Sequence, residues 1–108
     1  MSAQRTYTLL VSGLHFEWDD AKAAANRRKH RIGFEEARSV FLDEDALLLP
    51  DPEHSASEER FVLLGYSEDA RVLVVCHCYR ATGEIIRIIS ARKANRHEQA
   101  QYFERRTR

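Results

Sequence analysis

Three apolar segments follow one another in the second half of the chain with only short turns between them. They span residues 60–67, 71–80 and 84–92 and are rich in Val, Ile, Leu and Tyr. Gaps of this length join neighbouring antiparallel strands, because a parallel connection needs about a dozen residues or more. A chain of 108 residues built around such a meander forms a single domain, since two domains would leave each half too small for a core.

Helical signals flank this meander. Asp19 is a good N-cap for an alanine-rich helix over residues 20–30, which is acidic at its start and basic at its end. A second helix follows Gly33, and the pair Asn95 and Glu98 starts a third. With short strands at 15–18 and 46–49, the predicted order is β-α-α-β-β-β-β-α. We therefore expect an α+β fold with a mainly antiparallel sheet, two N-terminal helices and one C-terminal helix.

The two ends of the predicted domain are less regular. Residues 1–14 are interpreted as an N-terminal extension, in which residues 7–11 are either a strand or loose, and residues 15–108 as the domain itself. Residues 50–55 contain two prolines, which remove ladder donors, so an extended loop is expected there. Within the strand at 84–92, strict alternation points Ile86, Ile88, Ser90 and Arg92 to one face and Arg87 to the other.

The formal net charge is zero, which argues against a protein that is basic over its whole surface. The total hides a segregation along the chain, however. Residues 1–34 carry six basic and three acidic groups. Residues 35–59, the acidic segment, carry one basic and nine acidic groups, and residues 60–108 carry ten basic and five acidic groups. Two opposite solvated faces would explain this pattern; so would a basic concavity for a polyanion. The second interpretation predicts that folding gathers the basic ends and turns the acidic segment away.

Cys76 and Cys78 lie two residues apart on a predicted strand, about 6.5–7 Å from each other, which is too far for a relaxed disulfide. Free thiols indicate a reducing compartment, most simply the cytoplasm. We interpret Cys76-His77-Cys78 as core residues, with a zinc site as the weaker alternative, because no further ligands lie near them in sequence. No apolar run approaches the ~20 residues of a membrane span, so no membrane association is expected.

Three blocks of residues resemble a known family. The first runs from Phe16-Glu17-Trp18-Asp19 through Lys29-His30 to Gly33-Phe34-Glu35-Glu36-Ala37, the second is Glu58-Glu59-Arg60-Phe61 with Gly65, and the third is Arg87-Ile88-Ile89-Ser90-Ala91-Arg92-Lys93-Ala94 with Glu98 and Tyr102. In this order and spacing they are similar to the BrnT family of type II toxins. The resemblance covers about residues 15–104.

The resemblance implies a RelE-like ribonuclease that acts on mRNA in the cytoplasm without a cofactor. It also implies a cognate antitoxin of the BrnA type, which carries a DNA-binding domain, joins the toxin in a hetero-oligomer such as a heterotetramer, and represses the operon. The neutral charge of this chain keeps a second interpretation open, namely a binding module that has lost catalysis and acts only as antitoxin partner and co-repressor.

Cleavage of RNA by its own 2′-OH needs a proton acceptor, a proton donor and cations at phosphorus. We expect Arg60 and Arg92 to hold phosphate, since a guanidinium fork matches its oxygens. His30 has a suitable chemistry for proton transfer, and Tyr102 for base stacking or a proton relay. Further cations expected to bind RNA are Lys22, Lys29, Arg87, Lys93 and Arg96, and no metal ligand is expected.

Several of these residues have structural alternatives. His30 ends a helix, where a protonated imidazole stabilises the helix dipole, and Tyr102 is equally suited to packing. Arg87 lies between isoleucines, so it either pairs with a carboxylate such as Glu17 or Glu59 or faces a ligand. The remaining possible acid–base groups are Glu58 and Glu59, which are equally suited to hold Arg60 or Arg87, and His54 in the acidic loop.

Overall fold

The computed structural model describes residues 6–11, 13–52 and 58–107, which form six strands and three α-helices. In chain order these are β1 (Thr6–Val11), β2 (Leu14–Asp19), α1 (Asp20–His30), α2 (Phe34–Ser39), the 3-10 turn η1 (Val40–Leu42), β3 (Leu47–Pro50), β4 (Phe61–Tyr66), β5 (Val72–Arg80), β6 (Ile85–Lys93) and α3 (Arg96–Arg106). The α+β class is confirmed, and so is the predicted order of elements from residue 14 onward.

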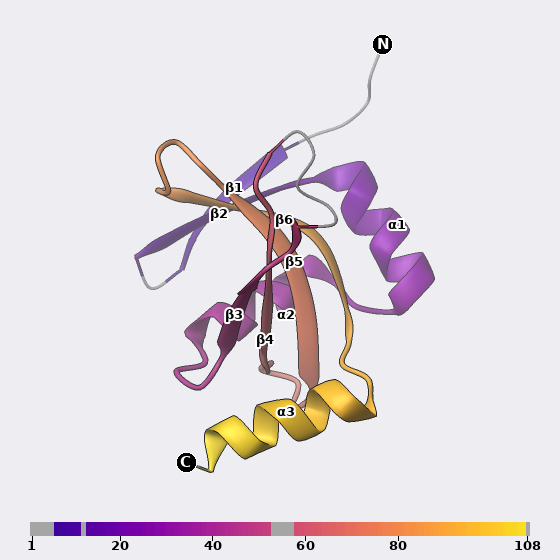
Figure 1. The fold of residues 1–108 in the computed structure, drawn as a ribbon. Helices are drawn as coiled ribbons and strands as arrows, with labels where there is room; N and C mark the ends of the chain where they lie inside the picture. Colours follow the sequence, from indigo (N-terminus) through magenta and orange to yellow (C-terminus); the bar gives the residue numbers. More distant parts are fainter. Residues whose placement is uncertain (1–5, 12, 53–57, 108) are drawn as a thin grey trace.

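All six strands belong to one sheet with the order β1-β2-β6-β5-β4-β3. Neighbouring strands are antiparallel except β2 and β6, which are parallel. The segment at residues 7–11, left open between strand and loose chain, is a strand that pairs with β2. Figure 1 shows α3 lying across one end of the sheet. α1 lies beside the strands, at some distance from α3.

The sheet buries apolar side chains on both of its faces. Leu63, Leu73 and Val75 join Phe34 and other residues of the helical segments in one cluster, whereas Leu64, Val72 and Val74 pack with Tyr102 of α3 in another. Alternate residues of β4 and β5 thus enter different clusters, as the period of two along a strand requires. We call the face towards α1 and α2 the helical face, and the other, which α3 covers only in part, the open face.

The register of β6 differs from the predicted alternation. Cys76 pairs with Ser90 but His77 pairs with Ile88, so Ile89 is an extra residue opposite β5. Such a bulge reverses the direction of every side chain beyond it. Arg87 pairs with Cys78 and Arg92 pairs with Val74, and these two β5 residues share a face. The prediction that Arg87 and Arg92 point in opposite directions is therefore wrong, because an unpaired residue separates them.

The carboxamide of Asn26 joins α1 to the edge of β6. β2 pairs with β6 only as far as Glu17 and Arg87, which leaves the following part of that edge without a neighbouring strand. There Asn26 Nδ2 donates to the carbonyl oxygen of Ala91 (2.9 Å), and Asn26 Oδ1 accepts from the Ala91 N–H (3.0 Å). The second amide proton binds the carbonyl oxygen of Ile32 (2.9 Å), so one buried side chain satisfies three backbone groups.

We expect Asn26→Ala to lower the free energy of unfolding by about 3 kcal/mol, because it leaves buried backbone groups without partners. Urea unfolding followed by circular dichroism measures this change. Lys22→Ala, at an exposed position one helical turn before Asn26, is the matched control and should change stability by less than about 0.5 kcal/mol. A loss below about 1 kcal/mol in Asn26→Ala would show that water replaces the carboxamide at this edge.

The acidic segment is not a separate solvated face. Glu36 of α2 is buried, and its carboxylate accepts from Arg71 Nε (2.8 Å), from Arg71 Nη2 (2.7 Å) and from the Ser67 hydroxyl (2.7 Å). The hydrogen bond from Arg71, together with that from Ser67, holds the pKa of Glu36 below its ordinary value despite the opposing effect of burial. Glu36 therefore fastens α2 to the β4–β5 turn.

This pair should make folding sensitive to acid. Because the folded-state pKa of Glu36 is depressed, its contribution to stability is complete above the ordinary value of 4.5 and is lost as the pH falls below that value. Urea unfolding at pH 7, 4.5 and 3 should show this loss, and Glu36→Gln should flatten that part of the profile. Glu35→Gln, a change of the same charge at an exposed position, should leave the profile as it is in the wild type.

Candidate functional site

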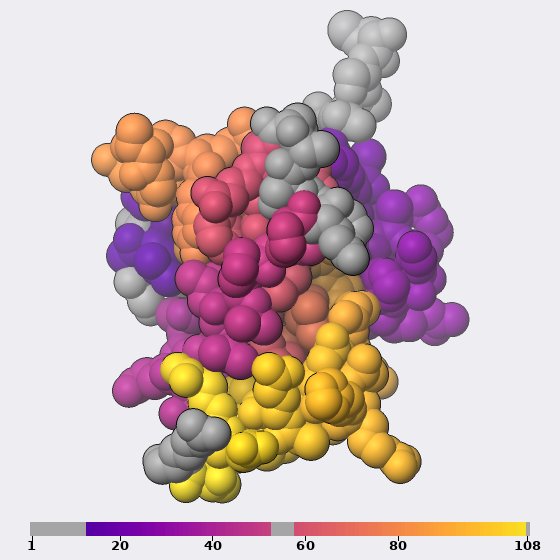
Figure 2. Space-filling view, viewed as in Figure 1, coloured from indigo at the N-terminus to yellow at the C-terminus, as the bar shows by residue number. Residues whose placement is uncertain are grey.

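A groove of about 430 Å³ opens on the open face of the sheet, where several of the predicted site residues meet. Its lining comes from the end of α1, the end of β3, and strands β4, β5 and β6: His30, Asp51, Arg60, Val62, Val74, Cys76, Ile89, Ser90, Ala91 and Arg92. In Figure 2, α1 lies on the right and α3 at the bottom, and strand residues reach the surface between them. The groove thus combines two guanidinium groups, an imidazole and a carboxylate over a floor of small side chains.

The floor follows from the register of three strands. Val62 of β4 pairs with Cys76 of β5, and Cys76 pairs with Ser90 of β6, so these side chains form one row across the open face. Val74 pairs with Arg92 in a neighbouring row. All of these side chains are short except Arg92, which leaves room above them for a ligand.

Arg60 and Asp51 form one wall of the groove. The Asp51 N–H donates to the carbonyl oxygen of Arg60 (2.9 Å), and this bond extends the β3–β4 ladder by one residue beyond the pair Pro50 and Phe61. Arg60 and Asp51 are therefore directly opposite each other, with Cβ atoms about 4.5–5.5 Å apart. Arg60 Nη2 also lies 4.0 Å from Glu58 Oε1, so Glu58 acts as a partner of this arginine.

Arg92 of β6 lines the groove, and Glu98 of α3 holds its guanidinium in place. Arg92 Nη1 and Nη2 donate to the two carboxylate oxygens of Glu98 at 2.8 and 2.9 Å. Glu98 also accepts from the Asn95 N–H (2.8 Å) and completes the capping box of α3. The hydrogen bond from Arg92 lowers the pKa of Glu98, which stays ionised and keeps Arg92 in one orientation.

His30 is the last residue of α1, and its position at the groove follows from the way Asn26 attaches this helix to β6. The two residues are one helical turn apart, so they lie on the same side of α1. Because Asn26 is bound to the edge of β6 at Ala91, His30 joins the lining of the groove, to which Ser90 and Arg92 also belong. His30 is half-buried there.

Arg87 pairs with a carboxylate, which was one of its two predicted alternatives. Arg87 Nη1 lies 2.6 Å from Glu17 Oε2, and Arg80 Nε lies 3.5 Å from the same oxygen. Arg80 Nη2 in turn lies 3.5 Å from Glu58 Oε2. Together with the Glu58–Arg60 contact, these pairs connect Arg87 with the groove wall as a row of alternating charges.

The other predicted RNA-binding residues lie outside the groove. Lys22 and Lys29 are exposed on α1, and Lys93 and Arg96 are exposed at the junction of β6 and α3. The predicted gathering of the basic residues away from the acidic ones is therefore wrong. Carboxylates of the acidic segment lie against arginines instead, because the sheet register and the turn residues place opposite charges side by side.

Tyr102 is also not part of the groove. It is buried, it stacks on Tyr66 with ring centroids 6.3 Å apart, and its hydroxyl donates to Asp43 Oδ2 (2.7 Å). Burial and this bond raise the pKa of Tyr102 well above its ordinary value. Asp43 accepts from the Tyr66 N–H as well (2.8 Å), so the structure places Tyr102 as a packing residue that attaches α3. His54 lies outside the described residues.

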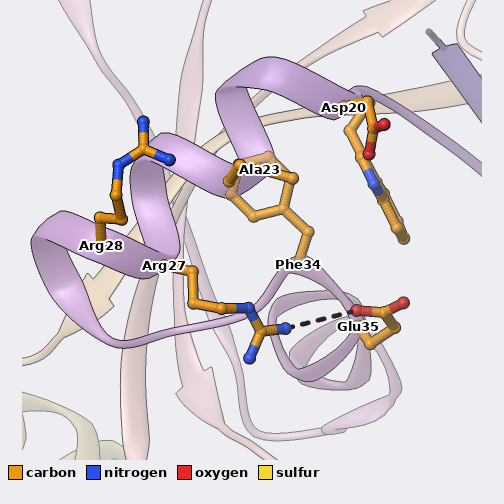
Figure 3. Close-up of a pocket in the computed structure, with 8 residues that line it drawn as sticks. Asp20, Ala23, Arg27, Arg28, Phe34 and Glu35 are labelled. Atoms are coloured by element: carbon orange, nitrogen blue, oxygen red, sulfur yellow. Dashed lines mark ion pairs between the residues drawn. The ribbon is translucent and has the colours of Figure 1, made fainter.

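A second and larger hollow, of about 650 Å³, lies between α1 and α2. Figure 3 shows that its lining includes Ala23 and Phe34, together with Arg27 of α1 and Glu35 of α2, which point towards each other. Arg27 Nη2 is 4.0 Å from Glu35 Oε1, and both side chains are exposed. This hollow has a mainly apolar floor and no imidazole, so the groove on the open face offers the better set of groups for acid–base chemistry on an anion.

The comparison with protein families decides the identity of the chain at the family level. Residues 18–98 match the model of the ribonuclease toxin, BrnT, of type II toxin-antitoxin systems. The chain belongs to this family. All residues that line the groove fall within the matched span, whereas β1 and most of α3 fall outside it. No curated protein matches the chain.

The BrnT assignment makes the chain a member of a family of ribonuclease toxins that occur with an antitoxin. No helix in the described part of the chain is long and apolar enough to cross a membrane. Within the same residues, no group of three or more His, Cys, Asp or Glu side chains is arranged to hold a metal ion. Cys76 and Cys78 are free thiols, and Trp18 is buried in the core.

Two polar groove residues of this BrnT-family chain, Ser90 and Asp51, have no role in the interpretation of the sequence. The sequence places Ser90 only on one face of a strand and Asp51 only in an acidic loop, and Cys76, interpreted as a core residue, lies in the groove floor. A signal for Asp51 was present, because it stands between Pro50 and Pro52, which fix the backbone on both sides. The position of Asn26 in the middle of a helix was also a signal, since Asn is a poor helix former without a specific contact.

The two thiols of the BrnT-family chain should differ in reactivity. Cys76 is half-buried in the groove and Cys78 is fully buried. Burial raises the pKa of both thiols, so both should react with iodoacetamide more slowly than a free cysteine at pH 7.5. Mass spectrometry after timed labelling should find Cys76 modified well before Cys78. Cys76→Ser is the control and should stay almost unlabelled while folded; equal labelling of both thiols would contradict the register of β5.

Proposed function

We propose that this chain is a metal-independent endoribonuclease whose active site is the groove on the open face. The observation that carries the proposal is the convergence of Arg60, Arg92 and His30 on one groove in a member of a ribonuclease toxin family. Arg60 immediately precedes β4, Arg92 lies in β6 and His30 ends α1, so only the folded chain brings them together. Phosphate recognition and proton transfer are the two tasks that this set of groups performs best.

The reaction is attack of a ribose 2′-OH on the adjacent phosphate. The phosphorus gains negative charge in the transition state, and guanidinium groups aimed at its oxygens stabilise that charge more than they stabilise the ground state. Arg92, oriented by Glu98, and Arg60, placed by the β3–β4 ladder, are suited to this task. His30 is the proton-transfer group, since an imidazole nitrogen can accept a proton and give it up again.

The biological substrate is mRNA in the cytoplasm, and the partner is a cognate antitoxin. Membership of a type II toxin–antitoxin family supports an antitoxin that neutralises this chain. We extend this to a BrnA-type protein with a DNA-binding domain that forms a hetero-oligomer with the toxin and represses their operon. Single-stranded RNA is the form of substrate that suits this groove, because its unstacked bases and its backbone can enter a groove on the face of a sheet.

Cleavage of RNA in the presence of EDTA tests the proposed function. The purified chain should convert an RNA oligonucleotide into fragments with 2′,3′-cyclic phosphate and 5′-hydroxyl ends, which mass spectrometry identifies. Arg60→Ala and Arg92→Ala should each reduce the rate by about 100-fold or more, because each removes a cation from the transition state. Arg28→Ala removes an exposed arginine that lines the other hollow, and it should cleave at nearly the wild-type rate.

Two results would contradict this proposal. Equal loss in Arg28→Ala and Arg60→Ala would mean that general charge, not the groove, governs the activity. Intact RNA with the wild-type chain, combined with tight binding of the antitoxin encoded beside it, would identify the chain as a binding module that has lost catalysis. Expression in cells identifies the second of these results. Growth arrest that the antitoxin relieves indicates an active toxin, whereas unchanged growth indicates the binding module.

A further inference from the structure

Among the described residues that line the groove, Asp51 is the only carboxylate. A negative charge at a phosphate-binding site weakens binding, because it repels the ligand that the two arginines attract. Asp51 stands directly opposite Arg60 across the β3–β4 ladder, where that repulsion is felt by any phosphate on Arg60. A carboxylate in this place is unfavourable for affinity, which points to a role in the chemical step.

The backbone holds Asp51 in one place. Pro50 fixes its own φ angle, and Pro52 restricts Asp51 to extended conformations. The Asp51 N–H is bonded to the Arg60 carbonyl at 2.9 Å, so the segment cannot rotate without breaking the ladder. The Cys76 thiol also lies against the Asp51 carboxylate, with Sγ 4.0 Å from Oδ2. Such fixed placement is what a proton acceptor needs in order to meet a reacting hydroxyl.

Asp51 and His30 lie on different sides of the groove. Asp51 follows β3, the edge strand, whereas His30 ends α1, which is bound to the edge of β6. Strands β4 and β5 run between these two edges and form the floor with β6. In RNA cleavage the attacking 2′-oxygen and the leaving 5′-oxygen are on opposite sides of phosphorus, so the proton acceptor and the proton donor must also stand on opposite sides.

We propose that Asp51 is the general base of this groove and His30 its general acid, a pairing that rests on the proposed ribonuclease function. The Asp51 carboxylate takes the proton of the 2′-OH while the 2′-oxygen forms its bond to phosphorus. The bond between phosphorus and the 5′-oxygen breaks, and the protonated imidazole of His30 gives its proton to that oxygen. The products are a 2′,3′-cyclic phosphate and a 5′-hydroxyl, and solvent returns the two groups to their starting protonation states.

The first experiment separates catalysis from binding. Asp51→Asn should lower kcat by 100-fold or more, which is the range of a lost general base. The same variant should bind a 2′-O-methyl RNA oligonucleotide as tightly as the wild type or more tightly, because a negative charge near the phosphate has gone. Glu44→Gln, an equal charge change at an exposed position, should alter neither quantity.

The second experiment assigns the two roles. An RNA oligonucleotide with sulfur in place of one bridging 5′-oxygen has a leaving group that departs without protonation. On this substrate His30→Ala should regain most of its lost activity relative to wild type, whereas Asp51→Asn should remain slow. Thermal unfolding of each variant shows whether the chain is folded, so that a loss of structure is recognised.

The outcomes distinguish this inference from the function on which it rests. An active wild type with Asp51→Asn within about threefold of it overturns the role of Asp51 and leaves the ribonuclease proposal standing. Parallel loss of binding and cleavage in folded Asp51→Asn assigns the residue to structure and overturns its role as a base. Rescue of Asp51→Asn by the sulfur substrate reverses the two assignments. A wild type that leaves RNA intact overturns both proposals together.

Discussion

The carboxamide of Asn26 is the interaction on which the arrangement of helices and strands depends. β2 leaves β6 to begin α1, so half of a central strand would have an unprotected edge. Asn26 supplies one donor and one acceptor to Ala91 there, in the manner of a neighbouring strand, and it binds the Ile32 carbonyl that leads into α2. One side chain thereby fixes α1, the connection to α2 and the position of His30 at the groove.

The fold was largely predictable because its signals are local. Hairpin-sized gaps between the strands at 60–92, the N-cap at Asp19 and the capping box of Asn95 and Glu98 each depend on neighbours in sequence, and all are present. The bulge at Ile89 has no such signal, since an extra residue in a strand leaves the apolar pattern plausible in either register. It was this long-range pairing that placed Arg87 and Arg92 on one face.

The groove was predictable only in part. Arg60, Arg92 and His30 carry groups whose chemistry marks them in the sequence, and they meet in the folded chain. Ser90 is a common residue in an unremarkable position, and the two prolines that flank Asp51 do not say what it faces; only the register of β3, β4, β5 and β6 brings both residues to the site. The apparent segregation of charge along the chain failed as a guide, because distance in sequence says little about which Arg meets which carboxylate. Glu36 with Arg71, and Glu17 with Arg87, are 35 and 70 residues apart.

The bulge also determines which changes of length β6 tolerates. Ile89 divides the strand into a part that pairs with β2 and a part that borders the groove. Removing this single residue would bring both parts into the same phase, so Ser90 and Arg92 would turn towards the helical core while Ala91 faced the groove. Gain or loss of residues in pairs would keep the phase and change only the reach of the strand. Insertions or deletions of an even number of residues at this point therefore retain the groove, whereas those of an odd number remove it and bury Arg92.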